Sequence, residues 1–210
     1  MIRFYEDAGV WWPDSEGDGA AHYVKNARVK DCEWATKRCK KARTVVQAGG
    51  YIGLWPKKLA SLFDRVITFE PVDELAYCVR KNTEGLGNIE LHQRALIAAL
   101  KPDQPLTETA FTWAPHGRSG VRNSPSETCV VATTIDALEL RDVDLIYLDL
   151  EGGEGAALEG ATQTIARCSP TIVVEINPPY KDITPKVLNR LGYEFECKAH
   201  TDHLFKRRPR

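Results

Sequence analysis

The sequence Gln47-Ala48-Gly49-Gly50-Tyr51-Ile52-Gly53 follows a short apolar run at 44–48 and precedes a helical pattern at 54–63. Glycines let the chain turn sharply and approach a ligand closely, because they carry no Cβ atom. A strand, a glycine turn and a helix in this order place backbone N–H groups at a helix N-terminus, where they can hold a ligand. We therefore expect a ligand-binding turn, with a purely structural turn as the alternative on this segment alone.

An acidic residue ends the next apolar run, where Thr68-Phe69-Glu70-Pro71 follows the glycines by about 20 residues. A carboxylate at this place can accept hydrogen bonds from both hydroxyls of an adenosine ribose, so the two features together favour a nucleoside cofactor. The turn lacks the G-x-G-x-x-G pattern of NAD sites and the G-K-[ST] pattern of ATP sites. S-adenosylmethionine is therefore the predicted cofactor.

The chain around the turn alternates between short apolar runs and helical stretches, as expected of a parallel sheet with crossover helices. We expect strands at 44–48, 66–69, 89–92, 145–150 and 171–176, and helices at 54–63, 74–84, 154–168 and 185–191. Thr184 and Pro185 suit the N-cap and first position of the last helix. Two further runs, 193–197 and 203–206, are too close together for a helical crossover and should form an antiparallel hairpin.

These counts predict an α/β, Rossmann-like class I methyltransferase fold, in which a seven-stranded, mostly parallel sheet ends in a C-terminal antiparallel hairpin. A length of 210 residues suits one domain. Within it we expect an N-terminal arm and basic helix at 1–43, with the helix at 21–42, and the methyltransferase domain at 44–210. A proline-rich excursion at 101–129 should lie over the pocket.

Composition narrows the choice of partners and location. The formal net charge of −1 argues against a surface built as a whole to bind nucleic acid. Local binding through the basic helix region 25–43 and the tail 206–210 stays possible, with a solvated helix face as the alternative. No stretch is apolar enough to span a membrane, and the N-terminus lacks the order of a signal peptide, so we expect a cytoplasmic protein. The six cysteines form no CxxC pair and are expected to be free thiols.

Several segments resemble the motifs of FkbM-type methyltransferases. The run VVQAGGYIGLWPKKLASLFDRVITFEP resembles V-x-D-x-G-A-N-x-G followed by F-E-P, and residues 144–152 resemble D-x-[IL]-K-[IL]-D-[VI]-E-G. Shorter likenesses lie at Asn88-Ile89 with Arg94-Ala95-Leu96, at 133–138 and at 173–176. The resemblance covers about 44–177. It implies a methyltransferase that uses S-adenosylmethionine on hydroxyls, often of sugars or natural products.

The sequence departs from this pattern at three places. Gln47 replaces an Asp, so we expect weaker cofactor binding through a neutral amide. Gly50-Tyr51 replaces Ala-Asn, which should place a large ring beside the cofactor. Tyr147 replaces a frequent Lys, and we expect a surface or core-edge change without catalytic meaning.

The candidate site residues lie beyond the carboxyl ends of the strands, where ligands bind in open α/β sheets. The predicted cofactor contacts are Gln47, Gly49, Gly50, Tyr51, Ile52, Gly53, Glu70, Pro71, Arg94, Ala95 and Asp149. The candidates for the base that takes the acceptor's proton are Asp149, Glu151 and Glu175, with Glu154 nearby. Asp149 and Glu151 would share a side if the strand continued, and could then hold a metal, but we expect no metal. Glu151 as a helix cap is a further alternative.

Other features leave alternatives open. Asn177-Pro178-Pro179-Tyr180 matches the N-P-P-Y motif of amino-group methyltransferases acting on adenine or glutamine, although its place after the fifth strand favours a proline turn. His116, Trp113 and the pair Trp11-Trp12 are candidates for acceptor contacts. Gln47 and Tyr51 also allow an inactive cofactor-binding or interaction module. The favoured acceptor is the hydroxyl of a small molecule or glycan, and the sequence does not predict the oligomeric state.

Overall fold

A computed structural model of the chain describes residues 1–99, 108–112, 120–121, 129–176 and 183–209. Its centre is a seven-stranded sheet in the order β12-β13-β11-β10-β3-β4-β5. The strands are β3 (Thr44–Ala48), β4 (Arg65–Phe69), β5 (Ile89–His92), β10 (Val143–Leu148), β11 (Thr171–Glu175), β12 (Tyr193–Ala199) and β13 (Asp202–Arg207). The first five are parallel, and β13 runs antiparallel to both β11 and β12. The predicted fold class, including the terminal hairpin, is confirmed.

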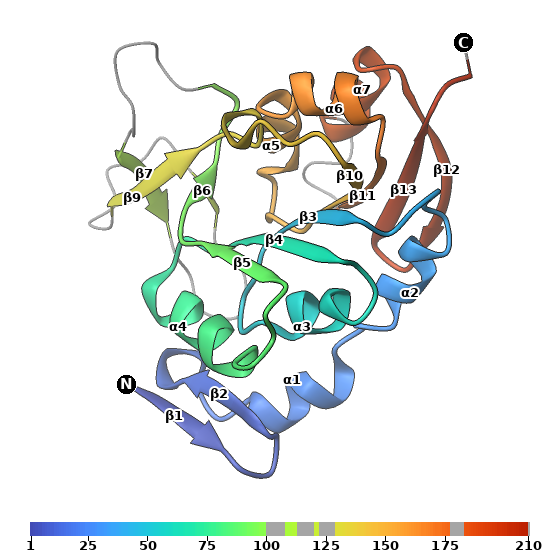
Figure 1. Ribbon diagram of the computed structural model, residues 1–210. Helices are drawn as coiled ribbons and strands as arrows, with labels where there is room; N and C mark the ends of the chain where they lie inside the picture. The colour runs from blue at the N-terminus through green and yellow to red at the C-terminus, as the bar shows by residue number, and fades with distance from the viewer. Residues whose placement is uncertain (100–107, 113–119, 122–128, 177–182, 210) are drawn as a thin grey trace.

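Helices cover both faces of the sheet, as Figure 1 shows. Side chains alternate along the strands, so the core has two layers, one on each face. Val45, Leu145 and Val173 pack with α2 (Asp31–Thr36) and α3 (Leu54–Ala60). Val46 and Ile146 face the other side, which α5 (Glu154–Glu159), α6 (Thr162–Cys168) and α7 (Ile183–Arg190) cover. Because both faces of the central strands are buried, polar side chains gather where the strands end.

A single long helix at 21–42 was predicted for the N-terminal segment, and this prediction was wrong. The segment forms a hairpin of β1 (Ile2–Tyr5) and β2 (Val10–Pro13), the turn η1 (Asp14–Glu16), and two short helices, α1 (Ala20–Asn26) and α2. Ala27 is extended, with ψ 125°, and separates the helices. The break has a packing reason: α1 joins a cluster around Trp12 and Ile52, whereas α2 joins the sheet core.

The predicted helix at 154–168 is likewise two helices, divided at Gly160. A Cβ on Gly160 would lie 2.2 Å from the carbonyl oxygen of Ile97, so the chain passes a neighbouring backbone too closely for a side chain. Helix α4 (Asp73–Asn82) starts one residue earlier than expected, and α7 already includes Thr184 and Pro185, which were expected at its start. Boundary shifts of this size are ordinary.

The excursion between β5 and β10 contributes a small sheet in the order β6-β9-β7-β8. Its strands are β6 (Ala95–Leu96), β7 (Glu108–Thr112), β8 (Gly120–Val121) and β9 (Cys129–Thr133), and the turn η2 (Asp136–Leu138) leads back to β10. The expectation that the excursion covers the pocket falls largely on residues outside the described ranges, as do His116 and Trp113.

Candidate functional site

A cavity of about 810 Å³ lies at the carboxyl ends of the parallel strands. The N-terminal segment, the glycine turn, the ends of β4, β10 and β11 and the start of β13 all contribute to its wall. Of the predicted site residues, Gln47, Gly49, Tyr51, Glu70, Pro71, Arg94, Ala95, Asp149, Glu151 and Glu175 line it. Residues more than 100 positions apart in the sequence therefore face one space.

The glycine turn is held tightly against its neighbours. Gly49 has φ 87°, and a Cβ there would lie 2.0 Å from the carbonyl oxygen of Asp149. The amides of Gly49 and Gly50 both donate to the carbonyl oxygen of Phe69, at 3.2 and 3.0 Å. Only a glycine at position 49 lets β3 and β10 end side by side at this point.

Three predicted cofactor contacts lie outside the wall of the cavity. Ile52 is fully buried in the core, and Gly50 packs against the side chains of Glu70 and Thr68. Gly53 has φ 93° and begins α3, close to Val79 of α4. These residues support the shape of the turn but do not line the cavity.

Glu70 is buried at one end of the cavity. Its two carboxylate oxygens accept hydrogen bonds from the amides of Tyr51, at 2.8 Å, and Val72, at 3.0 Å. Burial raises the pKa of Glu70 to about 7, against the opposing effect of these two bonds. A carboxylate oxygen has more than one lone pair, so Glu70 can still accept from a ligand hydroxyl.

The amide of Gln47 is engaged by the protein itself. Its nitrogen donates to the carbonyl oxygen of Gly49 at 2.9 Å, and its oxygen accepts from the hydroxyl of Thr68. Gln47 is almost fully buried although it touches the cavity. These two hydrogen bonds therefore fix the glycine turn to β4 rather than reach into the open space.

Tyr51 points toward the N-terminal segment. It adopts φ 48°, its hydroxyl donates to Glu16 at 2.8 Å, and its ring meets those of Trp12 and Tyr23 at 5.8 and 4.9 Å. Trp12 lines the cavity, whereas Trp11 packs against Phe4 and Tyr77 on the outside. The expected Trp11-Trp12 pair is therefore divided, and only Trp12 is placed to meet a ligand.

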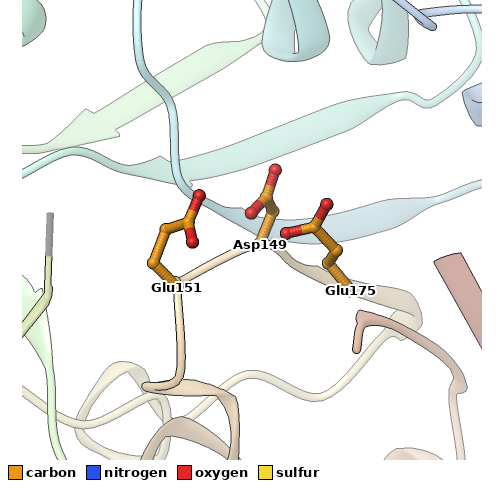
Figure 2. A group of neighbouring side chains, drawn as sticks. All are labelled: Asp149, Glu151 and Glu175. Carbon is orange, nitrogen blue, oxygen red and sulfur yellow. The ribbon is translucent and has the colours of Figure 1, made fainter. Parts of the chain in front are cut away.

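Asp149, Glu151 and Glu175 bring their carboxylates together, as Figure 2 shows. One oxygen of each lies within 4.8 Å of the others, a spacing that a metal ion can also bridge. The strand ends at Leu148, so strand alternation does not align Asp149 with Glu151 as we expected; a turn in which Glu151 has φ 49° does so. Glu154, not Glu151, caps this turn by accepting from the amide of Leu150 at 2.7 Å.

The environment of Asp149 favours its protonated form. Burial raises the pKa of Asp149 well above its usual value, and the charge of Glu175 and a hydrogen bond with it act in the same direction. Two carboxyl groups in such contact hold a proton between them. In its singly ionised form the pair offers a carboxylate oxygen that can accept a proton, which is the property of a general base.

Two residues of the cavity were missed as candidates. Tyr147 was expected at a surface or core edge, but it is 1% exposed and belongs to the sheet core. Its hydroxyl donates to Asp202 at the start of β13, and both residues line the cavity. The sequence offers only a weak signal for this contact, namely that Tyr147 precedes Asp149 by two positions on the same strand.

The described structure gives little support to nucleic-acid binding through the basic segments. Within 25–43 and the tail, Arg43 pairs with Asp144, Lys206 donates to Thr171, and Arg207 donates to Ser169, so these basic side chains serve the fold. No described helix has the length and apolar character needed to cross a membrane. The N-P-P-Y motif at 177–180 lies outside the described residues.

A family model described as "Methyltransferase FkbM domain" matches residues 48–195. The chain belongs to the FkbM methyltransferase family. The match contains the glycine turn, Glu70 and the three clustered acids, but it stops before Asp202. A comparison with curated proteins found no match.

Solved structures agree with the fold. The FkbM methyltransferase of Methylobacillus flagellatus KT is 16% identical, with a TM-score of 0.57, over 97% of this chain and 57% of that one. This FkbM chain therefore spans little more than half of that relative. A ribosomal protein L11 methylase of Lactobacillus delbrueckii subsp. bulgaricus gives 14% and 0.54, over 89% and 80%. Magnesium protoporphyrin IX methyltransferase of Synechocystis PCC 6803, solved with bound S-adenosylmethionine, gives 13% and 0.53, over 92% and 88%.

Proposed function

We propose that the chain transfers a methyl group from S-adenosylmethionine to a hydroxyl of a small polar acceptor, such as a sugar or natural product. One observation carries this proposal: a single cavity joins Glu70 and the glycine turn to the hydrogen-bonded acids Asp149 and Glu175. Glu70 and the glycine turn suit the binding of a nucleoside, and the two acids suit the removal of a proton. Membership of the FkbM family supports the same reaction class.

The residues present fit this cofactor. Gly49 lines the cavity without a side chain, and Glu70 offers carboxylate oxygens for ribose hydroxyls at the adjacent strand end. Arg94, Ala95 and Leu96 add wall on the side of β5, where a nucleoside base would lie. Gln47 supports the turn from behind. The cavity extends beyond the part that the glycine turn and Glu70 line. It continues past Asp149 to Asp202, and this further part leaves room for an acceptor.

The cofactor supplies, when bound, a methyl group on a positively charged sulfur. The chain's own residues must hold an acceptor oxygen in line with that methyl and exclude water, because positioning gives most of the rate in such a displacement. An acceptor hydroxyl that takes up the methyl group would lose its proton, so the chain has to offer a proton acceptor. The Asp149–Glu175 pair lies where it can take this proton in its singly ionised form.

Transfer of labelled methyl groups tests the proposal. The chain would be incubated with radiolabelled S-adenosylmethionine and panels of sugars, alcohols, amines and nucleic acids, and products would be analysed for O- or N-methylation. We expect label in hydroxyl groups, and a loss of roughly 10²-fold or more in Asp149→Asn. Glu159→Gln is the control, because this surface acid pairs with Arg190 away from the cavity. Label confined to amino groups would support the alternative amino-group reading instead.

Calorimetry with S-adenosylhomocysteine tests the cofactor site separately. Glu70→Ala removes a buried acceptor of charge-assisted bonds, so we expect its binding to weaken by roughly 1.5–3 kcal/mol. Unchanged affinity would mean that the ribose is held elsewhere. Binding without any methyl transfer would favour an inactive cofactor-binding module, and absence of binding would remove both readings.

A further inference from the structure

We propose that Asp202 is an acceptor-binding residue, that Tyr147 is the residue that positions it, and that the C-terminal hairpin thereby completes the acceptor half of the cavity. This inference rests on the proposed function, because it assigns the acceptor to the part of the cavity beyond Asp149. Neither residue belongs to the candidate set derived from the sequence, and Asp202 lies outside the family match at 48–195.

The sheet register places Asp202 beside the proposed base. Glu175 at the end of β11 and Asp202 at the start of β13 are direct partners across an antiparallel pair. Partners of this kind have Cα atoms about 4.5–5.5 Å apart. Asp149 follows β10, which is the next strand on the other side of β11. Across the edge of the sheet, Asp149, Glu175 and Asp202 therefore form a row that leads away from Glu70 and the glycine turn.

Tyr147 fixes one oxygen of Asp202. Its ring is buried on the central strand β10, and its hydroxyl donates to Oδ2 of Asp202 while also meeting the side chain of Trp55. No donor among the described residues bonds Oδ1. A buried tyrosine has few rotamers available, so the bond holds the carboxylate in one orientation with Oδ1 left for a ligand.

Asp202 is ionised at neutral pH in this setting. Burial raises its pKa to about 6, the bond from Tyr147 and the charge of Arg28 oppose this, and Asp31 and Glu175 add to it. An ionised carboxylate in a partly dry cavity makes hydrogen bonds of roughly twice the usual strength. Asp202 can thus accept a hydrogen bond from a second hydroxyl of the acceptor molecule. That hydroxyl would be next to the one that loses its proton to the Asp149–Glu175 pair.

Binding of a small polyol tests this assignment without knowledge of the acceptor. The probes are erythritol and 1,4-butanediol, which have the same carbon chain but differ in the two inner hydroxyls. Each would be titrated into the chain, alone and loaded with S-adenosylhomocysteine, with the aspartate carboxyl carbons enriched in ¹³C. The resonance of Asp202 is identified by its absence in Asp202→Asn.

We expect erythritol to move the Asp202 resonance and to bind about tenfold more tightly than 1,4-butanediol, with most of this preference lost in Asp202→Asn. In Tyr147→Phe the midpoint of the Asp202 titration should move to higher pH, because a bond that lowers its pKa is lost, and erythritol should bind several-fold more weakly. Tyr193→Phe is the matched control. Its hydroxyl is also buried but donates to the carbonyl oxygen of Pro170 at 2.9 Å, away from the cavity.

Equal binding of the two probes, no response of Asp202 to either, or the same changes in Tyr193→Phe would overturn the inference. Failure of the proposed function gives a different result, because S-adenosylhomocysteine would then not bind even to the unaltered chain. Its affinity should be the same in Asp202→Asn and in the unaltered chain if Asp202 serves only the acceptor.

Discussion

At Gly49 both the fold and the cavity require a residue that has no Cβ atom. A Cβ there would lie 2.0 Å from the Asp149 carbonyl oxygen, whereas Gly85, with a similar φ of 85°, has nothing within 4 Å of the same position. The two glycines therefore share the cost of a left-handed residue and differ in the clash. Their comparison isolates the contribution of close backbone approach.

We expect Gly85→Ala to lower the free energy of unfolding by roughly 1–2 kcal/mol, the cost of a left-handed alanine. Gly49→Ala should lose an additional 1–3 kcal/mol or so from overpacking, and with it the binding of S-adenosylhomocysteine. Urea unfolding and calorimetry on both variants measure this. Equal stability losses would show that the two strand ends separate easily.

At the scale of elements, Asn82 of α4 makes the backbone hydrogen bonds that join α4 to the N-terminal hairpin, beside the ring contact of Trp11 with Tyr77. Asn82 accepts from the amide of Trp11 at 2.6 Å and donates to the carbonyl oxygens of Trp11 and Ile52 at 2.9 and 2.7 Å. This arrangement joins β2 and α4 to Ile52 of the glycine turn. The position of Trp12 in the cavity wall thus depends on Asn82.

Asn82→Ala should remove three hydrogen bonds and reduce stability by about 2–3 kcal/mol. Hydrogen exchange is expected to rise across residues 2–13, while β10 and β11 stay protected. The control Asn88→Ala also loses two backbone contacts, to Ala60 and Phe63, but these lie at the other end of the sheet. Faster exchange across the whole chain in both variants would mean that Asn82 does not hold the hairpin separately from the rest of the fold.

The elements that the sequence predicted well are those with one strong local pattern. Four of the five parallel strands, β3, β4, β10 and β11, are mainly apolar runs with mostly buried side chains, and a five-residue connection leaves only a hairpin for the last two strands. Helices failed where two different packing partners divide a segment. Residues 21–42 look like one helix, but α1 and α2 pack in separate clusters. The break at Gly160 has another cause, because α5 and α6 share one cluster and the chain between them passes too close to the carbonyl oxygen of Ile97 for a side chain.

Site prediction had the same limit. The motifs located Glu70, Gly49 and the acids Asp149, Glu151 and Glu175 at strand ends, and all of them line one cavity. The contact between Tyr147 and Asp202 depends on the register of three strands, which no local pattern specifies. Likewise, Gln47 was expected to face the cofactor because its bonds to Thr68 and Gly49 are not visible in the sequence.

For the molecule as a whole, the buried acids give an unusual dependence of stability on pH. Burial raises the pKa values of Glu70, to about 7, and Asp202, to about 6, and also those of Asp149 and Glu154. A raised value means that the folded chain binds protons more tightly than the unfolded chain. For Glu70 and Asp202 the stabilising effect is complete below the unfolded pKa values and is lost as pH rises through 6 to 7.

We therefore expect the ligand-free chain to unfold more easily at about pH 8 than at about pH 5.5, with Glu70 alone contributing roughly 2 kcal/mol. Urea unfolding at the two pH values measures the difference, which Glu70→Gln should reduce and Glu159→Gln should not. Asp144 acts only at lower pH, because bonds from Arg43 outweigh burial and keep its pKa below the usual value. A chain that becomes more stable toward pH 8 would contradict this account.

The position of β13 has a consequence for how the protein is made. This strand follows β12 in the chain but lies inside the sheet, between β12 and β11. On the ribosome, β11 must therefore keep an open edge until β13 emerges, and such edges invite aggregation. Asp202 belongs to that same strand, so the cavity wall is incomplete until β13 has joined the sheet, and chains cut short before residue 202 would be both incomplete and prone to mispairing.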